Sequence, residues 1–192
     1  MRKLIFLVIM GLLMLIVSAC NSTETEQVTD ASVLTNTEIE AAYQRAVEAF
    51  IWFDLTPMPR DWENQIKDEY GNMFARVIHD EINTLAHLEA HLRSIFTPEL
   101  VSEILYMNYP YLFYRDFDGV LYVRDVDRGS SLTKGDETHE IIRVSDEKII
   151  YRVAVDIFDR DTLDEVIDTE VHDFAYVLVD GRWLFSNFNL VR

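Results

Sequence analysis

The strongest constraint on the fold is a series of hairpin signals in the second half of the chain. After Pro110, strand-like segments flank two Asp-Gly pairs, Asp118-Gly119 and Asp180-Gly181, and Asp-Gly favours a two-residue turn between antiparallel strands. A third tight turn is expected at Asp146-Glu147. The segment after it places apolar residues at every second position, as a strand with one buried face does: Ile149, Tyr151, Val153, Val155 and Ile157. The pattern predicts an antiparallel meander with strands at 111–117, 120–124, 139–145, 148–158, 166–179 and 182–191.

The first half of the folded region is predicted to be mostly helical. Thr37 and Glu40 have capping-box spacing before a helix to Asp54, and Asp61 is expected to cap a short helix at 62–70. Further helices are expected at 84–96 and 98–106, with a short strand at 73–78. Helices followed by hairpins indicate an α+β fold, with N-terminal helices packed on one face of a curved antiparallel sheet. The other face is expected to be partly covered, open to water or used for binding.

The first twenty residues predict export and lipid attachment. Arg2 and Lys3 precede an apolar run at 4–17, which is too short for a spanning helix and ends in small residues. The tetrapeptide 17–20 (VSAC) resembles the bacterial lipobox, in which the cysteine is lipidated and becomes the mature N-terminus. We therefore expect a signal peptide at 1–19, a lipidated Cys20 with a flexible tether at 20–36, and one domain at 37–192. The expected location is the outer face of the cytoplasmic membrane.

Charge and composition exclude several classes of function. The 192 residues carry a formal net charge of −17, which phosphate backbones would repel, so nucleic-acid binding is excluded. Cys20 is the one cysteine, and its acylation would leave no thiol for disulfides or catalysis. The sequence contains no Gly-x-Ser-x-Gly elbow, phosphate-binding loop or dinucleotide fingerprint. We therefore expect a non-enzymatic protein without a cofactor.

Several strings resemble a known family. They are 95–100 (IFTPEL), 118–123 (DGVLYV), 127–129 (DRG) and 180–188 (DGRWLFSNF). Together with the element order, they resemble NTF2-like (cystatin-like) extracytoplasmic proteins, and among these the IseA-type inhibitors of DL-endopeptidases in Gram-positive bacteria. The resemblance implies a cone of helices on a bent sheet, and a cell-wall hydrolase as the partner. It transfers no inhibitory residue.

The expected partner-binding residues lie around the first hairpin. Aromatic side chains near loops commonly anchor protein interfaces, and an acidic surface would attract a more basic hydrolase. We expect some of Tyr106, Tyr109 and Tyr111 to be exposed. The candidate partner-binding residues are Tyr109, Tyr111, Asp116, Asp118, Asp125, Asp127 and Arg128, with Arg128 pairing with nearby carboxylates.

Other functions remain open at this point. A small-ligand or enzymatic domain would need a deep pocket in the cone, with Asp156 or Asp173 as the best candidates for an acid in it. An accessory lipoprotein would show an exposed patch without a pocket. His87 and His91 lie one helical turn apart but lack the His-Glu-x-x-His pattern, so we assign them to a solvated face and expect no metal site. The acidic loops lack EF-hand spacing, and weak calcium binding there is the remaining alternative.

Overall fold

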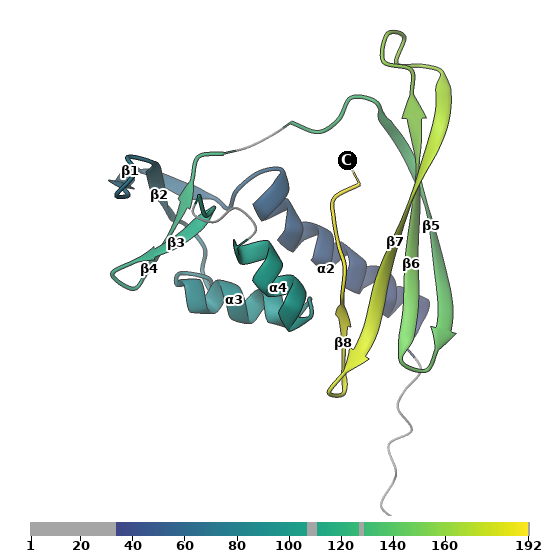
Figure 1. The fold of residues 1–192 in the computed structure, drawn as a ribbon, viewed down its shortest axis with the longest axis horizontal. Coiled ribbons are helices and arrows are strands. Elements are labelled where there is room, and N and C mark those ends of the chain that lie inside the picture. Colours follow the sequence, from purple (N-terminus) through teal and green to yellow (C-terminus); the bar gives the residue numbers. More distant parts are fainter. Residues whose placement is uncertain (1–33, 107–110, 127–128, 192) are drawn as a thin grey trace, which may run out of the picture. The chain divides into compact units, whose positions relative to one another are not determined.

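The computed structural model describes residues 34–106, 111–126 and 129–191, and within them the chain is mixed α+β (Figure 1). The elements in chain order are α2 (Asn36–Asp54), β1 (Arg60–Lys67), β2 (Met73–Val77), α3 (Leu85–Arg93), α4 (Pro98–Tyr106), β3 (Tyr114–Phe117), β4 (Val120–Arg124), β5 (Lys134–Ser145), β6 (Lys148–Phe158), β7 (Val166–Val179) and β8 (Arg182–Phe185). None of these helices is both long and apolar enough to cross a membrane. The expected signal peptide and Cys20 lie outside the described residues.

The strands form two antiparallel sheets rather than the single meander expected from the sequence. Sheet A has the order β1-β2-β4-β3, and sheet B has the order β5-β6-β7-β8. The prediction of one sheet was wrong because the β3–β4 hairpin pairs with β2, through Phe74–Arg76 and Tyr122–Arg124, and not with β5. Sheet B alone is the predicted meander of hairpins.

The helix expected at 62–70 is also wrong, since this segment forms most of β1. The local signal was real: Asp61 Oδ1 accepts a hydrogen bond from the Glu63 amide at 2.9 Å, as an N-cap would. However, the chain continues into a strand that pairs Gln65–Lys67 with Met73–Ala75 of β2. Pairing with a neighbouring strand thus overrides local helix propensity here.

Helix α2 begins two residues earlier than the expected capping box. Thr35, and not Thr37, is the N-cap, and its partner is Glu38, whose Oε2 accepts from the Thr35 amide at 2.8 Å. This box places Leu34 and Ile39 at the two positions of a hydrophobic staple, and Ile39 is fully buried. The earlier start therefore gives the helix an additional apolar anchor.

The core includes residues of all three helices and of both sheets, and within it α2 packs on the inner face of sheet B. Tyr43 of α2 stacks on Tyr151 of β6 with ring centroids 4.2 Å apart, and Phe188 stacks on Phe174 of β7 at 4.7 Å. The predicted alternation in β6 is confirmed, because Ile149, Tyr151, Val153 and Val155 are all at most 2% exposed. All residues of the core cluster lie between Leu34 and Val191.

Sheet A is attached to the core through a buried tyrosine. The Tyr114 hydroxyl donates to the Trp52 carbonyl at 3.1 Å and accepts from the Met58 amide at 3.0 Å. Its ring packs against Phe53, with centroids 5.0 Å apart. Burial raises the pKa of the Tyr114 hydroxyl, so the group stays protonated and can serve both partners.

Candidate functional site

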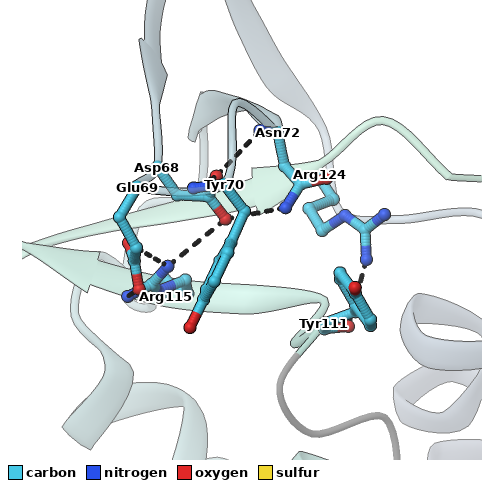
Figure 2. Close-up of polar contacts among 7 residues, drawn as sticks. All are labelled: Asp68, Glu69, Tyr70, Asn72, Tyr111, Arg115 and Arg124. Atoms are coloured by element: carbon cyan, nitrogen blue, oxygen red, sulfur yellow. Dashed lines mark hydrogen bonds and ion pairs between the residues drawn. The ribbon is translucent and has the colours of Figure 1, made fainter.

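Two exposed tyrosines, Tyr70 and Tyr111, contact each other at the edge of sheet A. Tyr70 follows β1 and is 62% exposed; Tyr111 precedes β3 and is 55% exposed. Their ring centroids lie 6.4 Å apart (Figure 2). We call the group Asp68, Glu69, Tyr70, Asn72, Tyr111, Arg115 and Arg124 the tyrosine surface.

Tyr70 is presented by a turn that Asp68 holds together. The Asp68 carboxylate accepts hydrogen bonds from the Tyr70 amide at 2.9 Å and from the Asn72 amide at 2.7 Å. The Asn72 side chain donates a third bond at 2.8 Å (Figure 2). Gly71 takes a φ of +84°, which favours glycine. The turn is therefore ordered by its own side chains.

Arg115 of β3 fastens this turn to the neighbouring hairpin. Its guanidinium donates to Glu69 at 3.0 and 3.2 Å and lies 3.4 Å from Asp68. The hydrogen bond from Arg115 lowers the pKa of Glu69. Burial by itself would raise the pKa of Asp68, but the Asn72 and Tyr70 hydrogen bonds and the Arg115 charge outweigh it and lower that pKa. Both carboxylates are thus ionised at neutral pH and suited to accept hydrogen bonds rather than to donate protons.

Arg124 orients the second tyrosine. Its guanidinium donates to the Tyr111 carbonyl at 3.1 Å and lies 5.9 Å from the centre of the Tyr111 ring (Figure 2). The Arg124 amide also bonds the Phe113 carbonyl at 2.9 Å, which extends the β3–β4 pairing by one residue. Tyr111 is therefore exposed but fixed at both its backbone and its ring.

Aromatic side chains support the tyrosine surface from the adjoining strands. On the same side of sheet A, Phe117 makes edge contacts with Phe74 at 5.5 Å and with Tyr122 at 5.6 Å. Arg115 lies over Phe117, 5.3 Å from the ring centre. Tyrosine and arginine on a rigid base are the residues that most often carry the binding energy of protein interfaces.

The structure gives the predicted acidic residues mainly local roles. Asp116 Oδ1 accepts from the Gly119 amide at 2.7 Å, and Asp118 occupies the turn with a φ of +54°. Asp125 pairs with Arg60 at 2.5 Å. The expected pairing of Arg128 with nearby carboxylates stays a prediction. All three aspartates are exposed on or beside the β3–β4 hairpin. Tyr109, Asp127 and Arg128 lie outside the described residues.

The predicted exposure of aromatic side chains is confirmed for two of the three residues named. Tyr106 is 50% exposed and Tyr111 is 55% exposed, whereas Tyr109 lies outside the described part of the chain. Of these, Tyr111 is the one that the structure brings against a second exposed tyrosine, Tyr70.

The inner face of sheet B, where a cone pocket would lie, is filled by side chains. Tyr43, Tyr151, Phe174 and Phe188 occupy it, each at most 8% exposed. Two hollows lie beside α2: one of about 430 Å³ is lined by residues that include Glu40 and His139, and one of about 240 Å³ is lined mainly by α2 and the C-terminal segment. Both are open at the surface.

The acid and histidine candidates from the sequence, Asp173, His87 and His91, do not line a pocket. Asp173 accepts two hydrogen bonds from Arg152, at 2.7 and 2.8 Å, and these lower its pKa. His91 is half-buried against Trp52, with centroids 5.3 Å apart, and burial lowers its pKa; His87 is exposed. Within the described residues no group of three or more histidine, cysteine or acidic side chains is arranged to hold a metal ion.

Sequence reasoning missed Tyr70, Asp68 and the two arginines of the tyrosine surface. It assigned Tyr70 to the end of a helix, so it did not expect a turn beside β3. The available signal was the string 68–72 (DEYGN), in which Asp, Gly and Asn are turn formers.

Neither the family models nor the curated proteins contain a match to this chain.

Proposed function

We propose that this chain is an extracytoplasmic lipoprotein, anchored through Cys20, whose folded domain binds another protein and does not catalyse a reaction. The tyrosine surface is the observation that carries this proposal. Tyr70 and Tyr111 are more than half exposed, yet a hydrogen-bonded turn and an arginine hold them in place. Because these side chains are already ordered, a partner that covers them loses little conformational entropy on binding.

The partner proposed is a peptidoglycan endopeptidase, which the domain would inhibit by covering its cleft. The net charge of −17 supports a basic partner, because opposite charges accelerate encounter. Asp116, Asp118 and Asp125 are exposed on or beside the β3–β4 hairpin, whose strands also carry Arg115 and Arg124, and they would contribute to this attraction. The endopeptidase itself comes from the resemblance to IseA-type inhibitors.

The NTF2-like cone is likewise part of the proposal. Helix α2 against the inner face of sheet B agrees with a helix-covered sheet. Sheet A is an addition that the resemblance does not explain, and it is the part of the structure that carries the tyrosine surface.

The test measures binding and inhibition directly. Residues 34–192, which contain the whole core cluster, are mixed with a purified peptidoglycan endopeptidase at low and high salt, and binding and hydrolysis are followed. We expect saturable inhibition that weakens as salt screens the charges. In parallel, the same domain is used to capture partners from a cell-envelope extract at both salt concentrations. The proposal is wrong if the domain neither binds nor slows such enzymes at low salt.

Variants locate the binding surface. Tyr70→Ala and Tyr111→Ala are each expected to weaken binding by roughly tenfold or more, as truncation of an interface hot spot does. Leu132→Ala, which shortens a 79% exposed side chain outside both sheets, is the control and should leave binding unchanged. If the two tyrosine variants bind the partner as tightly as Leu132→Ala does, the tyrosine surface is not the binding surface.

The anchor needs a separate test, because it rests on the sequence alone. Cells expressing the full chain are labelled with a radioactive fatty acid. We expect label on the wild-type protein and none on Cys20→Ser. Label on both would remove Cys20 as the attachment site.

A further inference from the structure

The larger of the two hollows beside α2 contains a buried hydroxyl without a hydrogen-bond partner. This hollow of about 430 Å³, which we call the α2–β5 hollow, is lined by Thr37, Glu40, Ala41 and Gln44 of α2, His139 of β5 and Tyr151 of β6. Tyr151 is only 2% exposed, and none of the residues that the structure describes forms a hydrogen bond with its hydroxyl. Because buried hydroxyls normally have a partner, this one is suited to bind a molecule that enters the hollow.

The aromatic rings beneath the hollow are already packed against one another. Tyr151 stacks on Tyr43 with ring centroids 4.2 Å apart, and the His139 ring lies 5.7 Å from each of them. Tyr43 is itself only 3% exposed. A flat ligand in the hollow therefore finds no tyrosine face to stack on, and recognition depends on the polar groups of the lining.

Helix α2, which lies along the inner face of sheet B, brings an acidic side chain to the Tyr151 hydroxyl (Figure 1). Thr37, Glu40 and Gln44 are three and four residues apart, so they lie on one side of the helix. Glu40 is exposed, and its carboxylate pairs with no other described residue. Burial and the charges of Glu40 and Glu137 raise the pKa of Tyr151 to about 12. The hydroxyl is therefore protonated at neutral pH and lies within the influence of the Glu40 charge.

The lining groups favour an organic cation over other ligands. The residues that line the hollow include no lysine or arginine, so an anion would face the Glu40 carboxylate without a compensating charge. Within the described residues no group of three or more metal-ligating side chains is arranged to hold a metal ion. A primary ammonium group has three N–H donors. The Glu40 carboxylate, the Tyr151 hydroxyl and the Gln44 amide oxygen offer it three acceptors of different kinds.

We propose that the α2–β5 hollow binds a small organic cation through a primary ammonium group. The Glu40 carboxylate supplies the opposite charge, and the Tyr151 hydroxyl and the Gln44 side chain accept the remaining N–H groups. The net charge of −17 also raises the concentration of cations near the surface of the protein. The inference is independent of the proposed inhibition, which uses the tyrosine surface of sheet A.

The experiment is calorimetric titration of residues 34–192, which contain the whole core cluster, with three small probes. Putrescine is the primary diamine, butanediol has the same chain with hydroxyls in place of the amines, and tetramethylammonium carries the charge without an N–H group. We expect saturable binding of putrescine, which also raises the melting temperature. Butanediol should bind at least about tenfold more weakly and tetramethylammonium about fivefold more weakly, because each lacks one part of a charge-assisted hydrogen bond.

Matched variants locate the bound amine. Glu40→Gln should weaken putrescine binding by about tenfold or more, whereas Glu48→Gln, which removes the same charge from an exposed position of α2 outside both hollows, should not. Tyr151→Phe should weaken binding by about fivefold. Its control is Tyr176→Phe, since Tyr176 is also buried on the inner face of sheet B but lines neither hollow. Ala41→Leu fills the hollow without changing the charge and should abolish binding.

Each outcome supports or overturns the site. Thermal melting of every variant without a probe separates loss of binding from loss of the fold, and Ala41 is exposed, so its substitution leaves the core intact. The proposal is wrong if the wild-type protein does not bind putrescine, or if butanediol or tetramethylammonium binds as tightly. Equal losses from Glu40→Gln and Glu48→Gln would show general attraction of cations to an acidic protein. Unchanged binding by folded Tyr151→Phe or Ala41→Leu would exclude the hollow as the site.

Discussion

Sheets A and B are both four-stranded and antiparallel, but different interactions hold them in place. Sheet B rests on α2 through stacked aromatic rings, such as Tyr43 on Tyr151, and its strands run to 14 residues. Sheet A has strands of at most eight residues, and polar contacts link its turns and edges: Asp68 and Glu69 with Arg115, and Asp125 with Arg60. Both sheets bury residues in the core, Leu121 and Val123 of sheet A among them, but the exposed turns of sheet A are held by individual hydrogen bonds and ion pairs.

This difference has a consequence for binding. The aromatic contacts that support sheet B lie on its inner face and are buried. The polar contacts of sheet A reach the surface, where they order Tyr70 and Tyr111. The residues that hold sheet A in place therefore also shape its exposed surface, whereas the rings that support sheet B are buried.

The largest predicted effect is a loss of folding stability when the core against sheet B is truncated. Phe174→Ala should lower the free energy of unfolding by about 3–5 kcal/mol, because it leaves a cavity among Tyr43, Phe188 and the His172 ring. Urea denaturation followed by circular dichroism measures this loss.

The matched control is Phe117→Ala on the outer side of sheet A. Phe117 is only half-buried, so its truncation should cost clearly less than that of Phe174. If the two variants lose the same stability, the distinction between the two sheets drawn above is wrong.

The next largest predicted effect is a loss of stability when the hydrogen bonds that attach sheet A to the core are removed. Tyr114→Phe removes one hydroxyl that serves both the Trp52 carbonyl and the Met58 amide, and Met58 is fully buried. Leaving buried polar groups without a partner costs about 1–3 kcal/mol, so we expect a loss of that size. Chemical denaturation measures it.

A second tyrosine tests whether the hydroxyl is responsible. Tyr122→Phe, on β4 of the same sheet, changes the same group at a half-buried position and should shift stability by less than about 0.5 kcal/mol. A loss for Tyr122→Phe equal to that for Tyr114→Phe would show that the two buried hydrogen bonds are not the cause.

The two sheets also differ in how far the sequence predicts them. The alternation from Ile149 to Ile157 and the turn at Asp180-Gly181 correctly predict most of sheet B, because both patterns are local and lie within long strands. β8 is shorter than expected, since after Phe185 the chain leaves the sheet and buries Phe188 in the core.

Sheet A could be predicted only in part. The β3–β4 hairpin follows from Asp118-Gly119, whose residues take φ values of +54° and +80°. β1 could not be recognised, because Asp61 makes the same local hydrogen bond at the start of a strand as it would at the start of a helix. The tyrosine surface depends on that strand. Sequence reasoning therefore found Tyr111 and missed Tyr70, its neighbour in space.

The smallest predicted effect is a pH dependence of the Asp68 turn. The folded protein lowers the pKa of Asp68 below its ordinary value of 3.8, so the carboxylate contributes stability above that value and loses it as the pH falls through the lowered, folded pKa. Asp68→Asn keeps the shape of the side chain but removes the charge that Arg115 and the turn amides contact. The variant should therefore melt below wild type at pH 7, and the difference should shrink as the pH falls below 3.8. Melting temperatures of both proteins between pH 7 and pH 2 measure this difference.

Asp118→Asn is the control, because Asp118 is exposed in a turn that asparagine also tolerates. A gap between wild type and Asp68→Asn that stays constant down to pH 2 would show that the Asp68 charge does not hold the turn, and the ordered presentation of Tyr70 would then need another cause.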